Sequence, residues 1–265
     1  MTDKPKTVIQ VQPRYDFRDE WDILAAKENL SYEALDFSTQ PALIESGLFE
    51  EYMEWYSACK RTTSVHGFFI DINPASGDPD FRRLSRERCI NSCRTAVSLG
   101  AKNVVFHSSC YPPLRGVYLD VWSKRCADFY QEIAERFDLN IWIENSADED
   151  AGPIETLMKR IEDKRVGVCL DIGHANYSRI PIRQWFEEVG EWIGYIHLSD
   201  NAGLYDDHLP LGEGTIDWDE ANELWKKLNR EETFITIETN GLVVTGKAVD
   251  FLKNNSYFGM ENDKH

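Results

Sequence analysis

The chain has 265 residues, with 29 Lys or Arg against 46 Asp or Glu, so its formal net charge at pH 7 is −17. A hydrophobic share of 42% and a charged share of 28% are typical of a folded globular protein and exclude a disordered one. This acidity makes nucleic acid an unfavourable ligand because it repels polyphosphate, and no apolar run reaches the roughly 18 residues of a membrane span.

Short β-rich apolar runs alternate with longer amphipathic stretches along the chain, and no linker or low-complexity segment interrupts them. The pattern predicts strands at residues 7–12, 30–37, 62–70, 103–107, 139–144, 166–171, 193–198 and 233–238. It predicts helices at residues 82–99, 118–137, 153–162, 182–191, 218–229 and 246–255. Asp217 and Glu220 resemble a capping box at the start of one of these helices.

Eight strands, each followed by a helical stretch, predict parallel βα units. At this length we expect them to close into one (β/α)8 TIM barrel domain covering residues 1–265. An open doubly wound sheet is the alternative, but the segment at residues 10–14 is not the glycine-rich turn that usually follows its first strand.

Alternation within the strands predicts which side chains point into the barrel. Because successive side chains face opposite sides, the apolar positions must face the helices and the polar positions the interior. For three strands the predicted interior sets are Asn140, Trp142 and Glu144, then Gly167, Cys169 and Asp171, then Ile193, Tyr195 and His197. In the last of these strands Gly194, Ile196 and Leu198 are predicted to face outward. Each interior set ends in a side chain that can bind a metal ion.

The carboxyl ends of the predicted strands carry many such side chains. They are His66, His107, Glu144, Asp171, His197 and Glu238, followed in the adjoining loops by His174, Asp206 and His208. Barrel enzymes build their sites at this end, and imidazoles with carboxylates favour zinc, manganese or cobalt over magnesium. Converging carboxylates would repel one another without a cation, which would raise at least one pKa.

Two further features concern compartment and anion binding. The six cysteines show no C-x-x-C spacing, and no apolar segment follows the first six residues, so we expect reduced thiols in a cytoplasmic protein. No glycine-rich phosphate cradle is evident. The candidate anion contacts are Arg14, Lys102, Arg115 and Arg179.

An ordered set of motifs resembles the xylose isomerase-like TIM-barrel superfamily, which unites sugar isomerases and epimerases with abasic-site nucleases of the endonuclease IV type. The motifs are His66-Gly-Phe-Phe, Val105-Phe-His107, Trp142-Ile-Glu-Asn145, Cys169-Leu-Asp-Ile-Gly-His174, Ile196-His-Leu-Ser-Asp200, Asp206-Asp-His-Leu-Pro-Leu-Gly-Glu-Gly214 and Ile237-Glu-Thr239. The resemblance extends from about His66 to Glu238. It implies a single divalent ion held, as in the epimerases, by Glu144, Asp171, His197 and Glu238, with His174 beside the substrate hydroxyls.

The nuclease branch holds three zinc ions, and the resemblance implies that His66, His107, His174, Asp206 and His208 would be the additional ligands. This chain matches that wider set as well, so we expect one ion but leave room for three. It departs from the nuclease pattern at Asp207, where that branch tends to have Arg between the Asp and the His. The run after His208 is more similar to the sugar isomerases and epimerases.

The expected function is a metal-dependent isomerase or epimerase of a small sugar or sugar phosphate. Glu144 and Glu238 would transfer protons through a metal-stabilised ene-diolate, while His174, His66 and His107 would contact the substrate. The alternatives are a zinc phosphodiesterase acting on abasic DNA, a dehydratase or lyase acting on an inosose or keto-sugar, and a non-catalytic sugar binder. We expect no membrane partner, and a homo-oligomer is compatible with the sequence.

Overall fold

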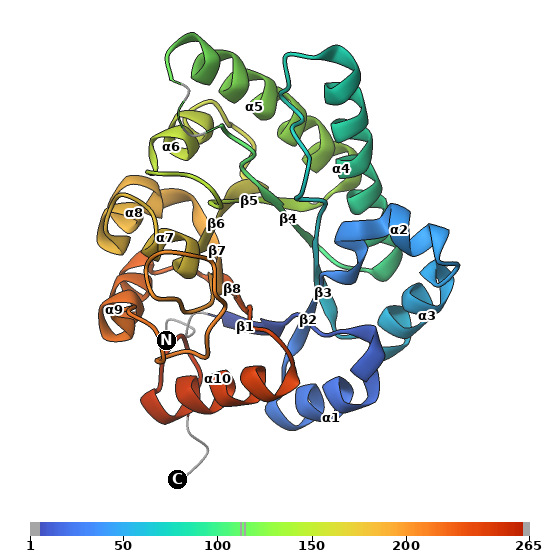
Figure 1. Ribbon diagram of the computed structural model, residues 1–265, viewed down its shortest axis with the longest axis vertical. Coiled ribbons are helices and arrows are strands. Elements are labelled where there is room, and N and C mark those ends of the chain that lie inside the picture. Colours follow the sequence, from blue (N-terminus) through green and yellow to red (C-terminus); the bar gives the residue numbers. More distant parts are fainter. Residues whose placement is uncertain (1–5, 112, 114, 262–265) are drawn as a thin grey trace.

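The computed structural model describes residues 6–111, 113 and 115–261; residues 1–5, which bear on the expectation of a cytoplasmic protein, lie outside the described part. Eight parallel strands close into a barrel in which each strand pairs with its neighbours in sequence and β8 pairs with β1 (Figure 1). The strands are β1 Lys6–Val11, β2 Ser31–Ala34, β3 Thr62–His66, β4 Asn103–His107, β5 Asn140–Glu144, β6 Val166–Asp171, β7 Ile193–Leu198 and β8 Glu232–Ile237. The predicted (β/α)8 barrel is confirmed.

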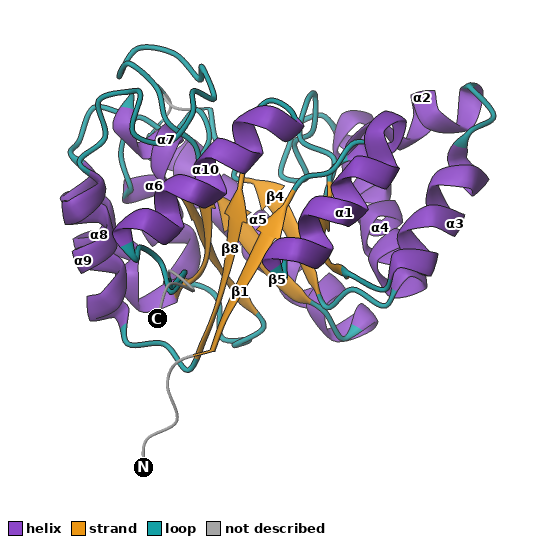
Figure 2. Cartoon of the chain, turned by 90° about the horizontal axis from the view of Figure 1, so that it is seen from below, coloured by secondary structure: helices purple, strands orange, loops and turns teal. Residues whose placement is uncertain are grey.

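Helices surround the barrel, and long loops lie at the end toward which the strand arrows point (Figure 2). The helices are α1 Arg18–Glu28, α2 Gln40–Glu45, α3 Phe49–Cys59, α4 Pro79–Leu99, α5 Val117–Phe137, α6 Gly152–Met158, α7 Ile172–Asn176, α8 Ile182–Val189, α9 Trp218–Leu228 and α10 Leu242–Asn255. Short 3-10 turns are η1 Tyr15–Phe17, η2 Asp36–Thr39 and η3 Gly190–Trp192.

Helix starts follow local capping. The helix α4 begins three residues earlier than predicted because Asp78 accepts hydrogen bonds from the backbone N–H groups of Asp80 and Phe81, with Pro79 at the first helical position. At α9, Asp217 accepts from the backbone N–H of Glu220 at 3.0 Å, as the capping box predicts. The Glu220 carboxylate instead pairs with Arg183, so the box is half formed.

The barrel interior contains a small apolar layer, separate from the larger core between strands and helices. Its buried residues are Val105, Cys169 and Tyr195, packed against Trp142 and Phe234. The predicted interior positions of Trp142, Cys169 and Tyr195 therefore hold. All six cysteines are free thiols.

The prediction for the start of β7 is wrong. Val168 pairs with Ile193 but Cys169 pairs with Tyr195, so β7 carries an extra residue beside β6. As a result Ile193 belongs to the outer core, whereas a Cβ at Gly194 would lie 2.6 Å from the Trp142 ring inside the barrel. The bulge leaves room for the indole, and period-two counting does not detect it.

No helix in the described ranges combines the length and the apolar character that a membrane span requires.

Candidate metal centre

Glu144, the last residue of β5, is the centre of the polar cluster at the carboxyl end of the barrel. Its side chain is fully buried, and four imidazoles surround it. The Oε1 atom lies 3.2 Å from Nδ1 of His197 and 3.4 Å from Nδ1 of His174. The Oε2 atom lies 3.3 Å from Nε2 of His66 and 3.4 Å from Nε2 of His107. Side chains from four strands and one short helix therefore converge on a single carboxylate position.

A second set of contacts surrounds His197, near the end of β7. Its Nδ1 atom lies 2.8 Å from Oε2 of Glu238 and 3.9 Å from Oδ2 of Asp171, in addition to the contact with Glu144. One ligand atom from each of these four residues lies within 4.8 Å of the others. An imidazole and three carboxylates at this spacing are a donor set suited to zinc or manganese.

Three buried carboxylate oxygens in this group test whether a cation fits. Glu144 Oε2, Asp171 Oδ2 and Glu238 Oε2 have no hydrogen-bond partner among the described residues, although imidazole nitrogens lie nearby. A buried anionic oxygen without a donor is costly, and a cation bound among these carboxylates would reduce that cost. His66, His107 and Glu144 form a second group that meets the same spacing and shares Glu144 with the first.

A third, outer group consists of His174, Asp206 and His208. Asp206 Oδ2 lies 3.3 Å from Nε2 of His174 and 3.0 Å from Nε2 of His208. Asp171 caps the helix α7 by accepting from the backbone N–H of His174 at 2.6 Å, which fixes the place of this histidine. The side chain of Asp206 is 39% exposed, so this group lies at the mouth of the cluster. All nine residues singled out by sequence therefore meet in one region.

The three central carboxylates differ in the direction in which their surroundings shift their pKa values. Burial by itself would raise the pKa of Glu144, but the charges of His197 and His107 hold that pKa well below its usual range. Burial and His197 oppose each other in the same way at Glu238, whose pKa is lowered to about 2. Burial dominates at Asp171, and with the negative charges of Glu238 and Glu144 it raises the pKa to about 7. The repulsion expected among converging carboxylates is thus concentrated on Asp171, where a cation would relieve it.

The histidines of the cluster also differ in their pKa values. Burial lowers the pKa of His107 to about 4, so this imidazole is neutral near pH 7 and able to bind a metal ion. Burial also disfavours the charged form of His208, but the hydrogen bond with Asp206 and the nearby carboxylates together outweigh it and raise the pKa to about 9.

A cavity of about 200 Å³ opens directly onto this cluster. Besides His66, His107, His174, Asp206, His208 and Glu238, it is lined by Gln12, Arg14, Leu35, Phe69, Thr239 and Asn240. Of the four candidate anion contacts, Arg14 lines this cavity. Lys102 lines a different cavity, shared with Thr62 and Arg165, while Arg115 pairs with Asp150 and Arg179 with Glu149.

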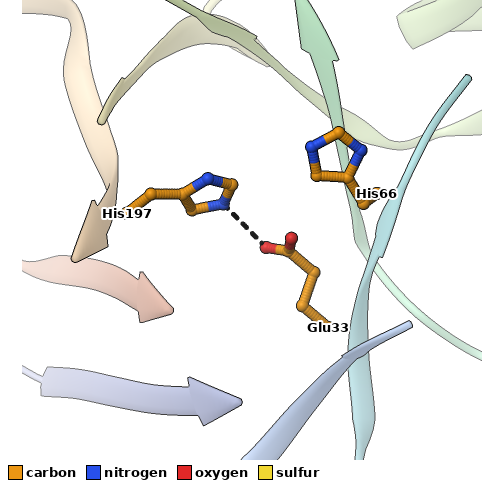
Figure 3. A group of neighbouring side chains, drawn as sticks. All are labelled: Glu33, His66 and His197. Carbon is orange, nitrogen blue, oxygen red and sulfur yellow. Dashed lines mark hydrogen bonds and ion pairs between the residues drawn. The ribbon is translucent and has the colours of Figure 1, made fainter. Parts of the chain in front are cut away.

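Two residues that sequence analysis did not assign to the site lie within it. Glu33 on β2 is fully buried, and its Oε2 atom lies 3.0 Å from Nε2 of His197 (Figure 3). Asn145 joins β5 to β6: its amide N–H donates to the carbonyl of Asp171, and its amide oxygen accepts from the backbone N–H of Asp171. The carbonyl of Asn145 lies 2.7 Å from Nδ1 of His174, which leaves Nε2 of His174 for Asp206. The sequence signal that could have identified Glu33 is an acidic side chain in the middle of the strand predicted at residues 30–37.

Comparisons with known proteins give relatives of two kinds. An uncharacterized protein of Methanocaldococcus jannaschii, MJ1311, is 29% identical over 211 residues, which cover 76% of this chain and 71% of that protein. A protein of Thermoplasma acidophilum named probable endonuclease 4 is 28% identical over 197 residues, covering 65% of each chain.

Solved structures resemble the whole barrel. A D-tagatose 3-epimerase-like protein superposes with a TM-score of 0.66 at 23% identity, covering 94% of this chain and 87% of that one. The protein TTHB071 of Thermus thermophilus, in a crystal soaked with ZnCl2, superposes with a TM-score of 0.73 at 22% identity, covering 94% and 97%. The family described as xylose isomerase-like TIM barrel matches residues 26–255. With this match spanning most of the sequence, the chain belongs to the xylose isomerase-like TIM barrel family.

Proposed function

We propose that this protein is a divalent-metal-dependent isomerase or epimerase of a small sugar. The observation that carries the proposal is the group formed by Glu144, Asp171, His197 and Glu238, whose buried ligand atoms lie beside a cavity of about 200 Å³. Such a cavity suits one small polar molecule rather than a polymer. The likeness to a D-tagatose 3-epimerase-like protein supports this substrate class.

The four residues of this group would hold the ion, and zinc, manganese and cobalt are the metals that this donor set favours. When bound, the ion would supply Lewis acidity that polarises a substrate carbonyl. Two solved structures of this fold support zinc: the crystal of TTHB071 was soaked with ZnCl2, and the structure of a protein named IOLI contains a bound zinc atom.

Glu144 and Glu238 would move the proton at the carbon next to the carbonyl. Glu144 ends β5, Glu238 directly follows β8, and both contact His197, so they flank the same space. One carboxylate would remove the proton from carbon, and the other, after taking up a proton from solvent or a substrate hydroxyl, would deliver it to the opposite face, which inverts the centre; return of the removed proton to the neighbouring carbon would isomerise the sugar. His174 faces the same region, where its imidazole would hold a substrate oxygen, and His66 and His107 line the cavity beside it.

Replacement of either proton-transfer residue tests the proposal. We expect Glu144→Gln and Glu238→Gln each to lower turnover of a ketose substrate by at least about 1,000-fold, because proton transfer loses its acid or base. Turnover would be followed by chromatographic separation of the two sugars in zinc- or manganese-loaded protein. Circular dichroism would show that the fold is kept. Wild-type rates in either variant would contradict the proposal.

One observation favours a second candidate, metal-dependent hydrolysis of a phosphodiester. His66 and His107 contact the second oxygen of Glu144, and His174, Asp206 and His208 form a third group, so donors for more than one ion are present. The similarity to a probable endonuclease 4 agrees with this candidate, whereas the net charge of −17 disfavours binding of DNA. Cleavage of an oligonucleotide that contains an abasic site, abolished by a chelator and accompanied by three ions per chain, would favour it over the sugar reaction.

A further inference from the structure

Glu33 lies inside the barrel, beside the polar cluster at its carboxyl end. The sequence predicted no functional role for this residue. Figure 3 shows its carboxylate directed at the imidazole of His197, with His66 on the far side of the same space. The residue is fully buried and comes from β2, 164 residues before His197 in the chain. Its distance to His197 would allow two roles: an additional metal ligand with His66 and His197, or a support for His197.

The hydrogen bonds of Glu33 distinguish these roles. Its Oε1 accepts from Nε2 of Gln12 at 2.8 Å, and its Oε2 accepts from the Thr236 hydroxyl at 2.9 Å, from the Tyr195 hydroxyl and from His197. Four donors thus satisfy both oxygens. Glu144, Asp171 and Glu238 each keep a buried oxygen without a hydrogen-bond partner among the described residues, whereas Glu33 does not. A carboxylate whose acceptor sites are filled by protein donors is poorly placed to bind an ion directly.

The two ring nitrogens of His197 have different surroundings. Nε2 faces Glu33 at 3.0 Å, while Nδ1 faces Glu238, Glu144 and Asp171. A carboxylate that only accepts requires a proton on Nε2, so a cation bound among the carboxylates on the other side would be met by the lone pair of Nδ1. We propose that Glu33 is a positioning residue that fixes the orientation and tautomer of His197, so that Nδ1 is available to the metal ion. This inference rests on the metal site of the proposed function and deepens it.

The barrel holds Glu33 in place from several strands. Tyr195 on β7, Thr236 on β8 and Gln12 just beyond β1 all donate to its carboxylate. The Tyr195 hydroxyl in turn accepts from Nε2 of Gln10 at 2.7 Å, so the network continues across the interior. Because each donor is fixed by a different strand, the carboxylate has little freedom to leave His197.

The test measures metal affinity rather than turnover. Metal-free protein would be titrated with zinc in competition with a chelator of known affinity. The number of bound ions per chain at saturation would be measured by inductively coupled plasma mass spectrometry. We expect Glu33→Ala to weaken zinc binding 10- to 100-fold, the usual effect of losing a carboxylate that orients a ligating histidine, with the ion count unchanged. Glu33→Gln, which can still accept from His197 through its amide oxygen, should recover part of the affinity.

Asp148→Asn is the matched control, because it also removes a buried acidic group but has no hydrogen bond to a proposed ligand. We expect its zinc affinity to stay within about threefold of the wild type, because Asp148 makes no hydrogen bond to the four proposed ligands and acts on the cluster only through its charge near His174. An equal loss in Asp148→Asn and Glu33→Ala would overturn the positioning role in favour of a general charge effect. A drop of one ion per chain in Glu33→Ala would overturn it in favour of direct ligation.

A measurement on the unaltered protein covers the case in which the variants fail to fold. In zinc-loaded protein with nitrogen-15 histidine, we expect the His197 signal to show a proton on Nε2 and none on Nδ1. A proton on Nδ1 would overturn the proposal, as would wild-type zinc affinity in Glu33→Ala. These readouts do not depend on sugar turnover, so a chain that binds zinc through Nδ1 and leaves every sugar unchanged would refute the proposed function alone.

Discussion

Asp148 shows how a single buried carboxyl beside the cluster sets a pH dependence of its own. The residue is 3% exposed, and its Oδ2 atom accepts from the Ser108 hydroxyl at 2.7 Å and from the backbone N–H of Ser146 at 3.2 Å. Its Oδ1 atom has no hydrogen-bond partner among the described residues. Burial outweighs these bonds and raises the pKa of Asp148 from 3.8 to about 6. The folded chain therefore binds this proton more tightly than the unfolded chain does.

The sign of the effect follows from that difference. Between about pH 4 and pH 6 the folded state holds the proton that the unfolded state has lost, so the contribution of Asp148 to the free energy of unfolding falls as pH rises. A raised pKa of this size corresponds to about 3 kcal/mol. We expect Asp148→Asn to gain stability relative to the wild type by about that amount between pH 4 and pH 7. Urea denaturation in the presence of a chelator would measure it; a difference that stays constant with pH would refute it.

At the scale of elements, the barrel and most of the cluster could be predicted from the sequence. Strand ends such as His107, Glu144 and Asp171 could be predicted to lie together because parallel strands of one barrel end at the same rim. Glu33 was not, because it lies inside a four-residue strand rather than at its end and its partner is distant in sequence. The β7 bulge was also not predictable, since it depends on the Trp142 ring from another strand.

The bulge makes a prediction about Gly194. A Cβ there would lie 2.6 Å from the Trp142 ring, which is closer than atoms pack, so we expect Gly194→Ala to destabilise the protein by about 1–3 kcal/mol. Gly246→Ala is the control, because it lies in α10 with no heavy atom within 4 Å of the added carbon. Alanine there should be neutral or stabilise by about 0.5–1 kcal/mol, as expected within a helix. Urea denaturation would compare them, and equal stability in the two variants would count against the packing argument.

At the scale of the whole molecule, closure of the barrel gathers negative charge at one end. Glu144 ends β5, Asp171 ends β6 and Glu238 directly follows β8, and Glu33 lies close to them across His197. The unfolded chain spreads these groups apart, so the folded state alone presents a site with several donors for a cation. Binding of an ion at the proposed site would therefore be coupled to folding, because an ion that binds only the folded chain stabilises it.

This coupling predicts the effect of metal on thermal unfolding. Zinc at about 100 times its dissociation constant should stabilise the fold by about 2.7 kcal/mol, which for a chain of this size raises Tm by about 5–10 °C. Differential scanning calorimetry with and without a chelator would measure the shift. Asp171→Asn should lose most of the shift, because it removes a ligand oxygen and relieves the repulsion that the ion would otherwise neutralise. An undiminished shift in that variant would mean that zinc binds elsewhere on the chain, and the charge gathered by the barrel would then be balanced by protons on its histidines.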